Sequence, residues 1–163
     1  MNIKKIVLAT LLMSFSVLSA QEKAKGYVYN DTNKNGKKES KEKGISNVLV
    51  SNGVDVVATD AKGKYEISLT DGQTLFVIKP NSYQFLLDEY NLPQFYYNYR
   101  PTGSPESKYK GIKPTGKLPK EINFALVPSQ ESEQFTAYAF GDPQAYNLEE
   151  IQYFKDGIVN EID

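Results

Sequence analysis

Apolar and polar residues alternate in short runs along the first three quarters of the sequence, and each run ends at a turn rich in glycine, asparagine or aspartate. The clearest run is KYEISL at residues 64–69, in which Tyr65, Ile67 and Leu69 fall on one face. Alternation with a period of two predicts half-buried strands. We expect strands at residues 25–30, 48–50, 54–59, 64–69, 74–79 and 122–127. The pattern as a whole predicts a mainly β fold, with an antiparallel β-sandwich domain at residues 21–128.

The pattern changes after the last of these strands. Residues 129–134 are polar and predict a linker, and residues 135–140 (FTAYAF) predict one more strand. Asn147, followed three positions later by Glu150, is typical of a helix N-cap. Apolar side chains then recur at helical spacing, at Leu148, Ile151, Phe154, Ile158 and Ile162. Residues 135–163 therefore predict a short strand–helix unit.

The first residues are of a different kind. Lys4 and Lys5 give a positive start, an apolar run follows at residues 6–18, and small residues end the run at Ala20. This is the pattern of a secretory signal peptide at residues 1–20. The apolar run is short for a membrane span, so we expect no span after cleavage and a secreted or periplasmic location.

Composition excludes several kinds of site. The sequence has no histidine and no cysteine, which excludes a histidine base, a histidine-ligated zinc site and disulfides. Loss of Lys4 and Lys5 with the leader lowers the basic residues from 19 to 17 against 20 acidic ones, a net charge of −3. That charge, without a basic stripe, argues against nucleic acid as a partner.

The segment DTNKNGKKESKE has the spacing of a calcium loop, with glycine at its sixth place and glutamate at its twelfth. Its candidate ligands are the carboxylates of Asp31 and Glu42, the amide oxygens of Asn33 and Asn35, and the main-chain carbonyl of Lys37. No helical pattern flanks the segment, which excludes a helix–loop–helix site and leaves a loop between strands. Lysines within it would weaken calcium binding. A solvated turn that binds no ion is an equal alternative.

A second unusual segment holds seven aromatic residues between positions 83 and 99. Exposed rings would stack on sugars, which would make a glycan or another cell-surface molecule the partner. Buried rings would instead cover the open end of the sandwich. Large aromatic side chains serve packing more often than sites, so we expect packing.

The stretch GYVYNDTNKNGKKESKEKGISNVLVSNG, followed by TDAKGKYEISL, resembles the Cna-B and SdrD-B surface modules of bacteria. That resemblance implies a prealbumin-like sandwich that serves as a stalk or spacer. Some modules of this type bind calcium at this loop.

The tail FTAYAFGDPQAYNLEEIQYFKDGIVNEID resembles the start of the catalytic domain of calcineurin-like metallophosphoesterases, where a strand ends in Asp-x-His. Asp142 and Gln144 stand at those two metal-ligand positions, with glutamine in place of histidine. YNYRPTGSP and LPKEINFALVP resemble the front domain of branches that carry Gly-Asp-x-Gln. The resemblance implies an enzyme that hydrolyses phosphate esters with two divalent metal ions.

The later metal ligands of that family have no counterpart in this sequence. We therefore expect residues 135–163 to be the truncated start of an α/β phosphoesterase domain, and the chain to be an inactive N-terminal fragment of a secreted enzyme. The alternative is a stand-alone secreted β-sandwich, a binding or stalk module that calcium stabilises or that binds a glycan.

Overall fold

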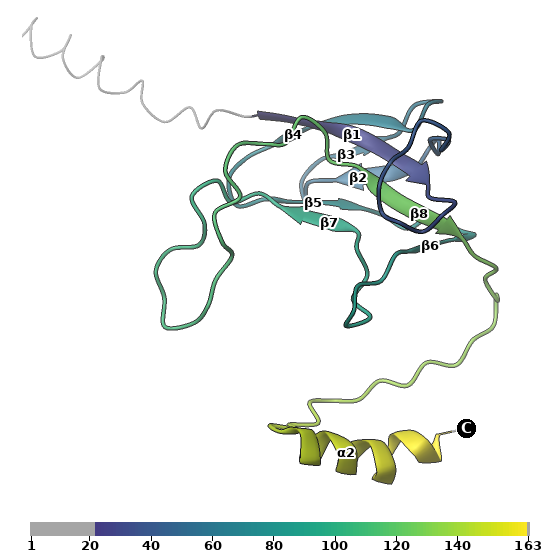
Figure 1. Cartoon of the computed structure of the whole chain (residues 1–163), viewed down its shortest axis with the longest axis vertical. Helices are drawn as coiled ribbons and strands as arrows, with labels where there is room; N and C mark the ends of the chain where they lie inside the picture. The colour runs from purple at the N-terminus through teal and green to yellow at the C-terminus, as the bar shows by residue number, and fades with distance from the viewer. Residues whose placement is uncertain (1–21, 163) are drawn as a thin grey trace, which may run out of the picture. The chain divides into compact units, whose positions relative to one another are not determined.

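The computed structural model describes residues 22–162, so the expected signal peptide at 1–20 lies outside the described residues. The strands are β1 (Glu22–Asn30), β2 (Leu49–Ser51), β3 (Val56–Ala58), β4 (Lys64–Leu69), β5 (Thr74–Val77), β6 (Tyr83–Phe85), β7 (Tyr96–Asn98) and β8 (Phe124–Pro128). One helix, α2 (Leu148–Gly157), and a 3-10 turn, η1 (Val159–Glu161), follow them. The chain divides into two compact units between Glu131 and Ser132 (Figure 1).

The first unit is a sandwich of two four-stranded sheets, with strand orders β4-β1-β8-β6 and β3-β2-β5-β7. This confirms the mainly β sandwich expected from the sequence. One pair departs from the antiparallel expectation, because β1 and β8 run parallel, with Val28 opposite Phe124. No hairpin joins these two strands, which lie far apart in the sequence, so no tight turn imposes an antiparallel pairing.

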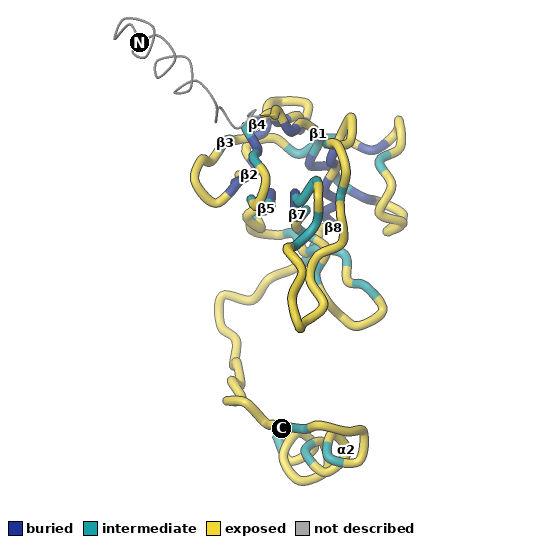
Figure 2. The backbone as a smooth tube through the Cα atoms, turned by 90° about the vertical axis from the view of Figure 1, so that its left-hand side faces the viewer, coloured by how far each residue is buried: buried dark blue, intermediate teal, exposed yellow. Residues whose placement is uncertain are grey.

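The core lies between the two sheets and follows from the alternation along each strand. In β4, Tyr65, Ile67 and Leu69 are buried and Lys64 and Glu66 are exposed, as the pattern predicts. Figure 2 shows the buried stretches gathered within the sandwich. The fully buried side chains of the core cluster are Val28, Val50, Leu69, Leu75 and Leu126.

Gly26 permits the close approach of β1 to the chain that enters β8. A Cβ atom on Gly26 would lie 1.8 Å from the main-chain oxygen of Ile122, which no side chain could accommodate. The same approach lets the Ile122 N–H donate to the Lys25 carbonyl at 2.9 Å.

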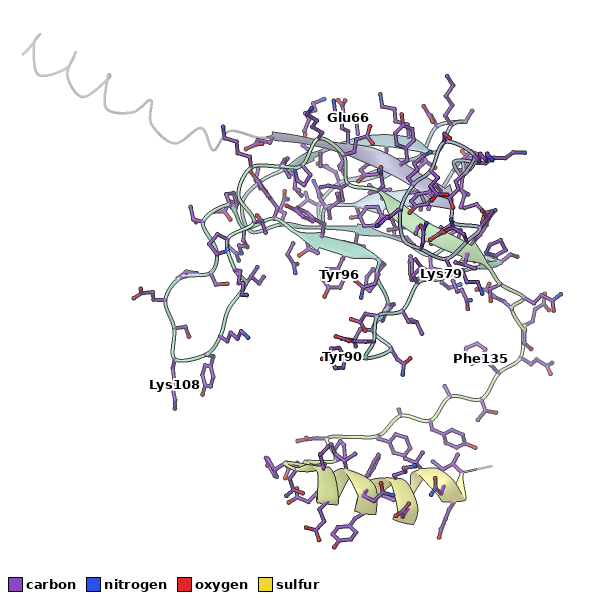
Figure 3. The ribbon with its side chains drawn as sticks, viewed as in Figure 1. Glu66, Lys79, Tyr90, Tyr96, Lys108 and Phe135 are labelled. Atoms are coloured by element: carbon purple, nitrogen blue, oxygen red, sulfur yellow. The ribbon has the colours of Figure 1, made fainter. Side chains whose placement is uncertain are left out.

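The aromatic segment forms two strands that the sequence pattern missed, β6 and β7, each three residues long. Packing is confirmed for its larger part, because Tyr99 is buried in the core and Tyr83, Phe85 and Tyr97 pack against it. Tyr90 and Tyr96 differ, with 74% and 52% of their surface exposed (Figure 3).

The second unit has less secondary structure than expected, with a helix and a 3-10 turn but no strand among its described residues. The predicted strand at residues 135–140 is wrong, since this stretch forms no ladder with any described strand, and a lone extended segment has no partner for its main-chain groups. The helix is confirmed: the Asn147 Oδ1 accepts the Glu150 N–H at 2.9 Å as an N-cap. Phe140 packs edge-on against Phe154, with ring centroids 5.1 Å apart. Within residues 22–162, no helix is long and apolar enough to span a membrane.

Candidate functional site

The loop at residues 31–42 begins where β1 ends, and its first residue is buried. Asp31 has no exposed surface, and its N–H donates to the Leu126 carbonyl of β8 at 2.9 Å. Its carboxylate accepts the N–H of Gly36 at 2.7 Å and, more weakly, that of Asn35 at 3.3 Å. Gly36 adopts a positive φ of 71°, which a glycine permits. Asp31 therefore folds the first half of the loop around its own carboxylate.

Glu42 closes the other end of the loop. Only 6% of it is exposed, and its two carboxylate oxygens accept the N–H groups of Thr32 at 3.1 Å and Glu39 at 3.0 Å. In this conformation both oxygens face main-chain donors, so a cation could use Glu42 only after its carboxylate turns. The hydrogen bond from the Thr32 N–H nevertheless joins Glu42, at the twelfth place of the motif, to the residue that follows Asp31, at the first place.

Between these ends, the two asparagines form side-chain turns. The Asn33 Oδ1 accepts the Asn35 N–H at 3.2 Å, and the Asn35 Oδ1 accepts the Lys37 N–H at 2.7 Å. Their amide nitrogens both donate to the carboxylate of Glu39, at 3.1 Å and 3.0 Å. Glu39 stands at the ninth place, where calcium loops often place a water-linked ligand. The sequence reasoning missed this residue, although the spacing alone could have identified it.

The two acidic residues at the ends of the loop, Asp31 and Glu42, are buried. The charged residues between them include the exposed Lys34, Lys37, Glu39 and Lys41. The ion pairs among residues 22–162 are Lys23–Glu66, Lys79–Glu131 and Arg100–Asp71, so none of them neutralises the two buried carboxylates. Burial of a carboxylate without a cationic partner costs free energy, and a bound cation would remove that cost.

Tyr29 lies beside these carboxylates on β1. It is fully buried, and its hydroxyl has no hydrogen-bond partner among the described residues. Burial, and then the negative charges of Asp31, Glu42 and Glu39, raise its pKa above the ordinary value for tyrosine. Lys38 lies over the Tyr29 ring, with its Nζ 5.9 Å from the centroid. The Tyr29 hydroxyl thus lies in the field of three carboxylates, with the Lys38 ammonium over its ring.

The donor set of the loop fits calcium. Carboxylates, amide oxygens and a main-chain carbonyl are the oxygen ligands that calcium takes. In the structure the side-chain oxygens of Asp31, Asn33, Asn35 and Glu42 accept main-chain N–H groups of the loop, so their role as calcium ligands stays a prediction. No group of three or more His, Cys, Asp or Glu side chains arranged to hold a metal occurs within residues 22–162, so the fit depends on the amide and carbonyl oxygens.

The second candidate site lies in the second unit. Asp142 and Gln144 are exposed, and the Gln144 amide donates to the Asp142 carboxylate at 3.1 Å. Both residues have a positive φ, 37° and 48°, which is uncommon for residues other than glycine. One carboxylate and one neutral amide leave most coordination positions of two metal ions empty, so these residues do not fit a two-metal centre on their own.

Residues 32–114 match the family described as N terminal of calcineurin-like phosphoesterase. The matched range covers half of the chain and includes most of the calcium-like loop, β2 to β7 and the aromatic segment. A comparison with curated proteins found no match.

Proposed function

This chain belongs to the family of N-terminal domains of calcineurin-like phosphoesterases, and we propose that its sandwich is the accessory domain of a secreted, metal-dependent phosphoesterase. The observation that carries the proposal is the family match over the sandwich itself. Two sequence features support it: the leader pattern at residues 1–20, and the Gly-Asp-Pro-Gln segment that follows the polar residues after the sandwich. The substrate of the complete enzyme would be a phosphate ester.

We propose that these residues alone hydrolyse no phosphate ester. A two-metal phosphoesterase needs ligands that bridge and flank both ions. Among the described residues the candidates are Asp142 and Gln144, and the sequence has no histidine to add. The role of the Asp142 carboxylate in a complete enzyme would be to hold one metal ion, which activates a water and neutralises phosphate charge.

The test is a hydrolysis assay of the purified chain with nitrophenyl phosphate mono- and diesters and added manganese or zinc. We expect no turnover above that of a matched Asp142→Ala variant. Metal-dependent turnover that Asp142→Ala abolishes would refute the proposal of an inactive domain. N-terminal sequencing of the exported protein tests secretion separately, with a new terminus expected just after Ser19 or Ala20.

A second proposed function concerns the loop at residues 31–42, which we assign as a weak structural calcium site. The observation in its favour is the burial of Asp31 and Glu42 without a cationic partner among the described residues. Calcium bound only by the folded state raises its stability by mass action. The exposed lysines beside the site lower its affinity, so we expect the effect at millimolar rather than micromolar calcium.

Thermal unfolding in calcium and in chelator tests this assignment. The midpoint should rise with calcium in the wild-type chain and stay unchanged in Asp31→Ala. Asp88→Ala is the matched control: this carboxylate also accepts N–H groups in a surface turn, those of Tyr90 and Leu92, but lies outside the loop. If the unfolding midpoint of the wild-type chain did not change with calcium, the calcium assignment would be wrong and the loop would be a solvated turn that binds no ion.

A further inference from the structure

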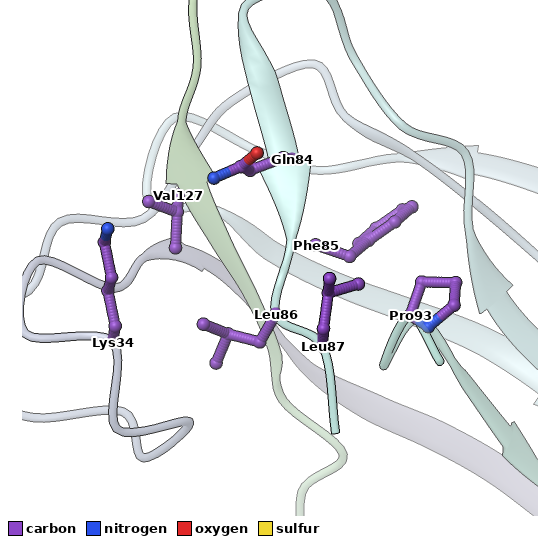
Figure 4. A pocket seen from close by; sticks show the side chains of 7 residues that line it. All are labelled: Lys34, Gln84, Phe85, Leu86, Leu87, Pro93 and Val127. Carbon is purple, nitrogen blue, oxygen red and sulfur yellow. The ribbon is translucent and has the colours of Figure 1, made fainter. Parts of the chain in front are cut away.

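A groove runs between the calcium-like loop and the segment that follows β6. It consists of two cavities, of about 240 Å³ and about 390 Å³, which share Lys34, Leu86 and Leu87 in their linings. Figure 4 shows the first cavity, with Lys34 on the loop side and Leu86, Leu87 and Pro93 across from it. Gly36 belongs to the loop wall, and its main chain lies close to Leu86, because a Cβ there would be 3.5 Å from the Leu86 Cδ1.

The first cavity is lined mainly by apolar side chains, whereas the second adds the polar Asn35, Gln94 and Asn123. Val127 of β8 and Leu86 are buried or half-buried, while Leu87 leaves 57% of its surface exposed. The one aromatic ring of the first cavity, Phe85, is stacked on Phe95 with centroids 5.2 Å apart. A wall of this kind suits the branched aliphatic side chain of a peptide. It offers no free ring face for a sugar to stack on.

The rim on the loop side is basic. Lys34 is exposed, is the charged residue among those that line the two cavities, and makes no hydrogen bond or ion pair with the described residues. Lys37 and Lys41 are exposed on the same loop, as is Glu39, whose carboxylate accepts the amide N–H groups of Asn33 and Asn35, while the acidic ends of the loop are buried. The opposite turn holds two acidic residues: the exposed Glu89, and Asp88, whose carboxylate accepts the N–H groups of Tyr90 and Leu92, both at 2.9 Å.

From this complementarity we propose that the groove docks an acidic peptide segment with an aliphatic anchor, supplied by a partner protein. The anchor side chain fills the cavity against Leu86 and Leu87. A flanking carboxylate pairs with Lys34. This function does not depend on phosphoesterase activity or on calcium, and it explains why a calcium-type loop carries lysines that a calcium site alone would not favour.

Fluorescence anisotropy of a labelled synthetic peptide, in which leucines are flanked by glutamates, tests the proposal on the full chain. Lys34→Gln should weaken binding about fivefold, as expected for one partly exposed ion pair, and Leu87→Ser about tenfold through lost apolar contact. Lys113→Gln and Leu92→Ser are matched controls outside the groove, Leu92 having the same 57% exposure as Leu87. A peptide with glutamine in place of glutamate should bind more weakly than the acidic one.

Thermal unfolding of each variant confirms that it is folded, and titrations in calcium and in chelator separate this proposal from the calcium site. Binding in both solutions supports it, whatever the outcome of the calcium test. The proposal would be overturned if the peptide did not bind. It would also be overturned if Lys34→Gln and Leu87→Ser bound the peptide as tightly as the controls do, or if an acidic polysaccharide displaced the peptide.

Discussion

The hydroxyl of Tyr65 links β4 to the chain that enters β8 by a hydrogen bond. Removal of this hydroxyl should lower the stability of the sandwich more than removal of an exposed one. It donates to the Ile122 carbonyl at 2.6 Å, and Tyr65 and Ile122 are 3% and 8% exposed. Tyr65→Phe keeps the ring in place beside Phe124, whose centroid is 6.1 Å away. The change therefore isolates one buried hydrogen bond between segments distant in sequence.

The magnitude follows from what the Ile122 oxygen loses. A net hydrogen bond contributes about 1 kcal/mol, and leaving a buried acceptor without its donor costs about 1–3 kcal/mol. We expect a loss of about 2 kcal/mol in the free energy of unfolding. With a urea dependence of about 1–2 kcal/mol per molar for a domain of this size, the midpoint should fall by about 1–2 M.

Urea unfolding followed by far-ultraviolet circular dichroism measures this change. Tyr90→Phe is the control, because Tyr90 is 74% exposed and its hydroxyl makes no hydrogen bond with the described residues. Equal midpoints for Tyr65→Phe and Tyr90→Phe would refute the reasoning that this bond supports the junction of β4 and β8.

Two further predictions concern alkaline stability and the helix. Burial, and then the hydrogen bond to Glu22, raise the pKa of Tyr99 to about 12, above the value of about 10 in an unfolded chain. Stability should therefore be retained below about pH 10 and fall as pH rises from there through about 12, since the unfolded state releases the proton first. Urea midpoints against pH measure this fall; it should be shallower in Tyr99→Phe, and an unchanged slope would contradict the assignment. Asn147→Ala removes the N-cap bond to the Glu150 N–H, which should destabilise α2 by about 1 kcal/mol and so lower its helical signal in circular dichroism. Asn81→Ala, an exposed residue of the first unit, should leave that signal unchanged.

The sequence was most informative where one physical pattern decides the outcome. Strict alternation placed β4 at the observed residues, and the Asn147 cap placed the start of α2. β6 and β7 were missed because a strand of three residues is too short to show an alternation of apolar and polar positions, above all in a segment rich in aromatic residues. The parallel pairing of β1 with β8 depends on tertiary contacts that no local pattern encodes.

For the candidate site, too, some features follow from the sequence pattern and others depend on the fold. The spacing predicts the candidate ligands of the loop, and the same spacing would have added Glu39 at the ninth place; binding of calcium by these residues stays a prediction. The burial of Tyr29 beneath the loop depends on how the loop folds back over β1, which spacing does not reveal. The strand at residues 135–140 was wrong because its apolar pattern is real, while a strand also needs a neighbour to pair with.

We propose that these residues bind metal in a structural role, at the loop of the sandwich, and not in a catalytic one, at Asp142 and Gln144. Isothermal titration of the full chain with calcium and with manganese, using Asp31→Ala and Asp142→Ala, tests this proposal. We expect a calcium-binding heat that Asp31→Ala removes and Asp142→Ala leaves unchanged, with no manganese binding that depends on Asp142. Calcium binding that survives Asp31→Ala, or manganese binding that Asp142→Ala abolishes, would contradict it.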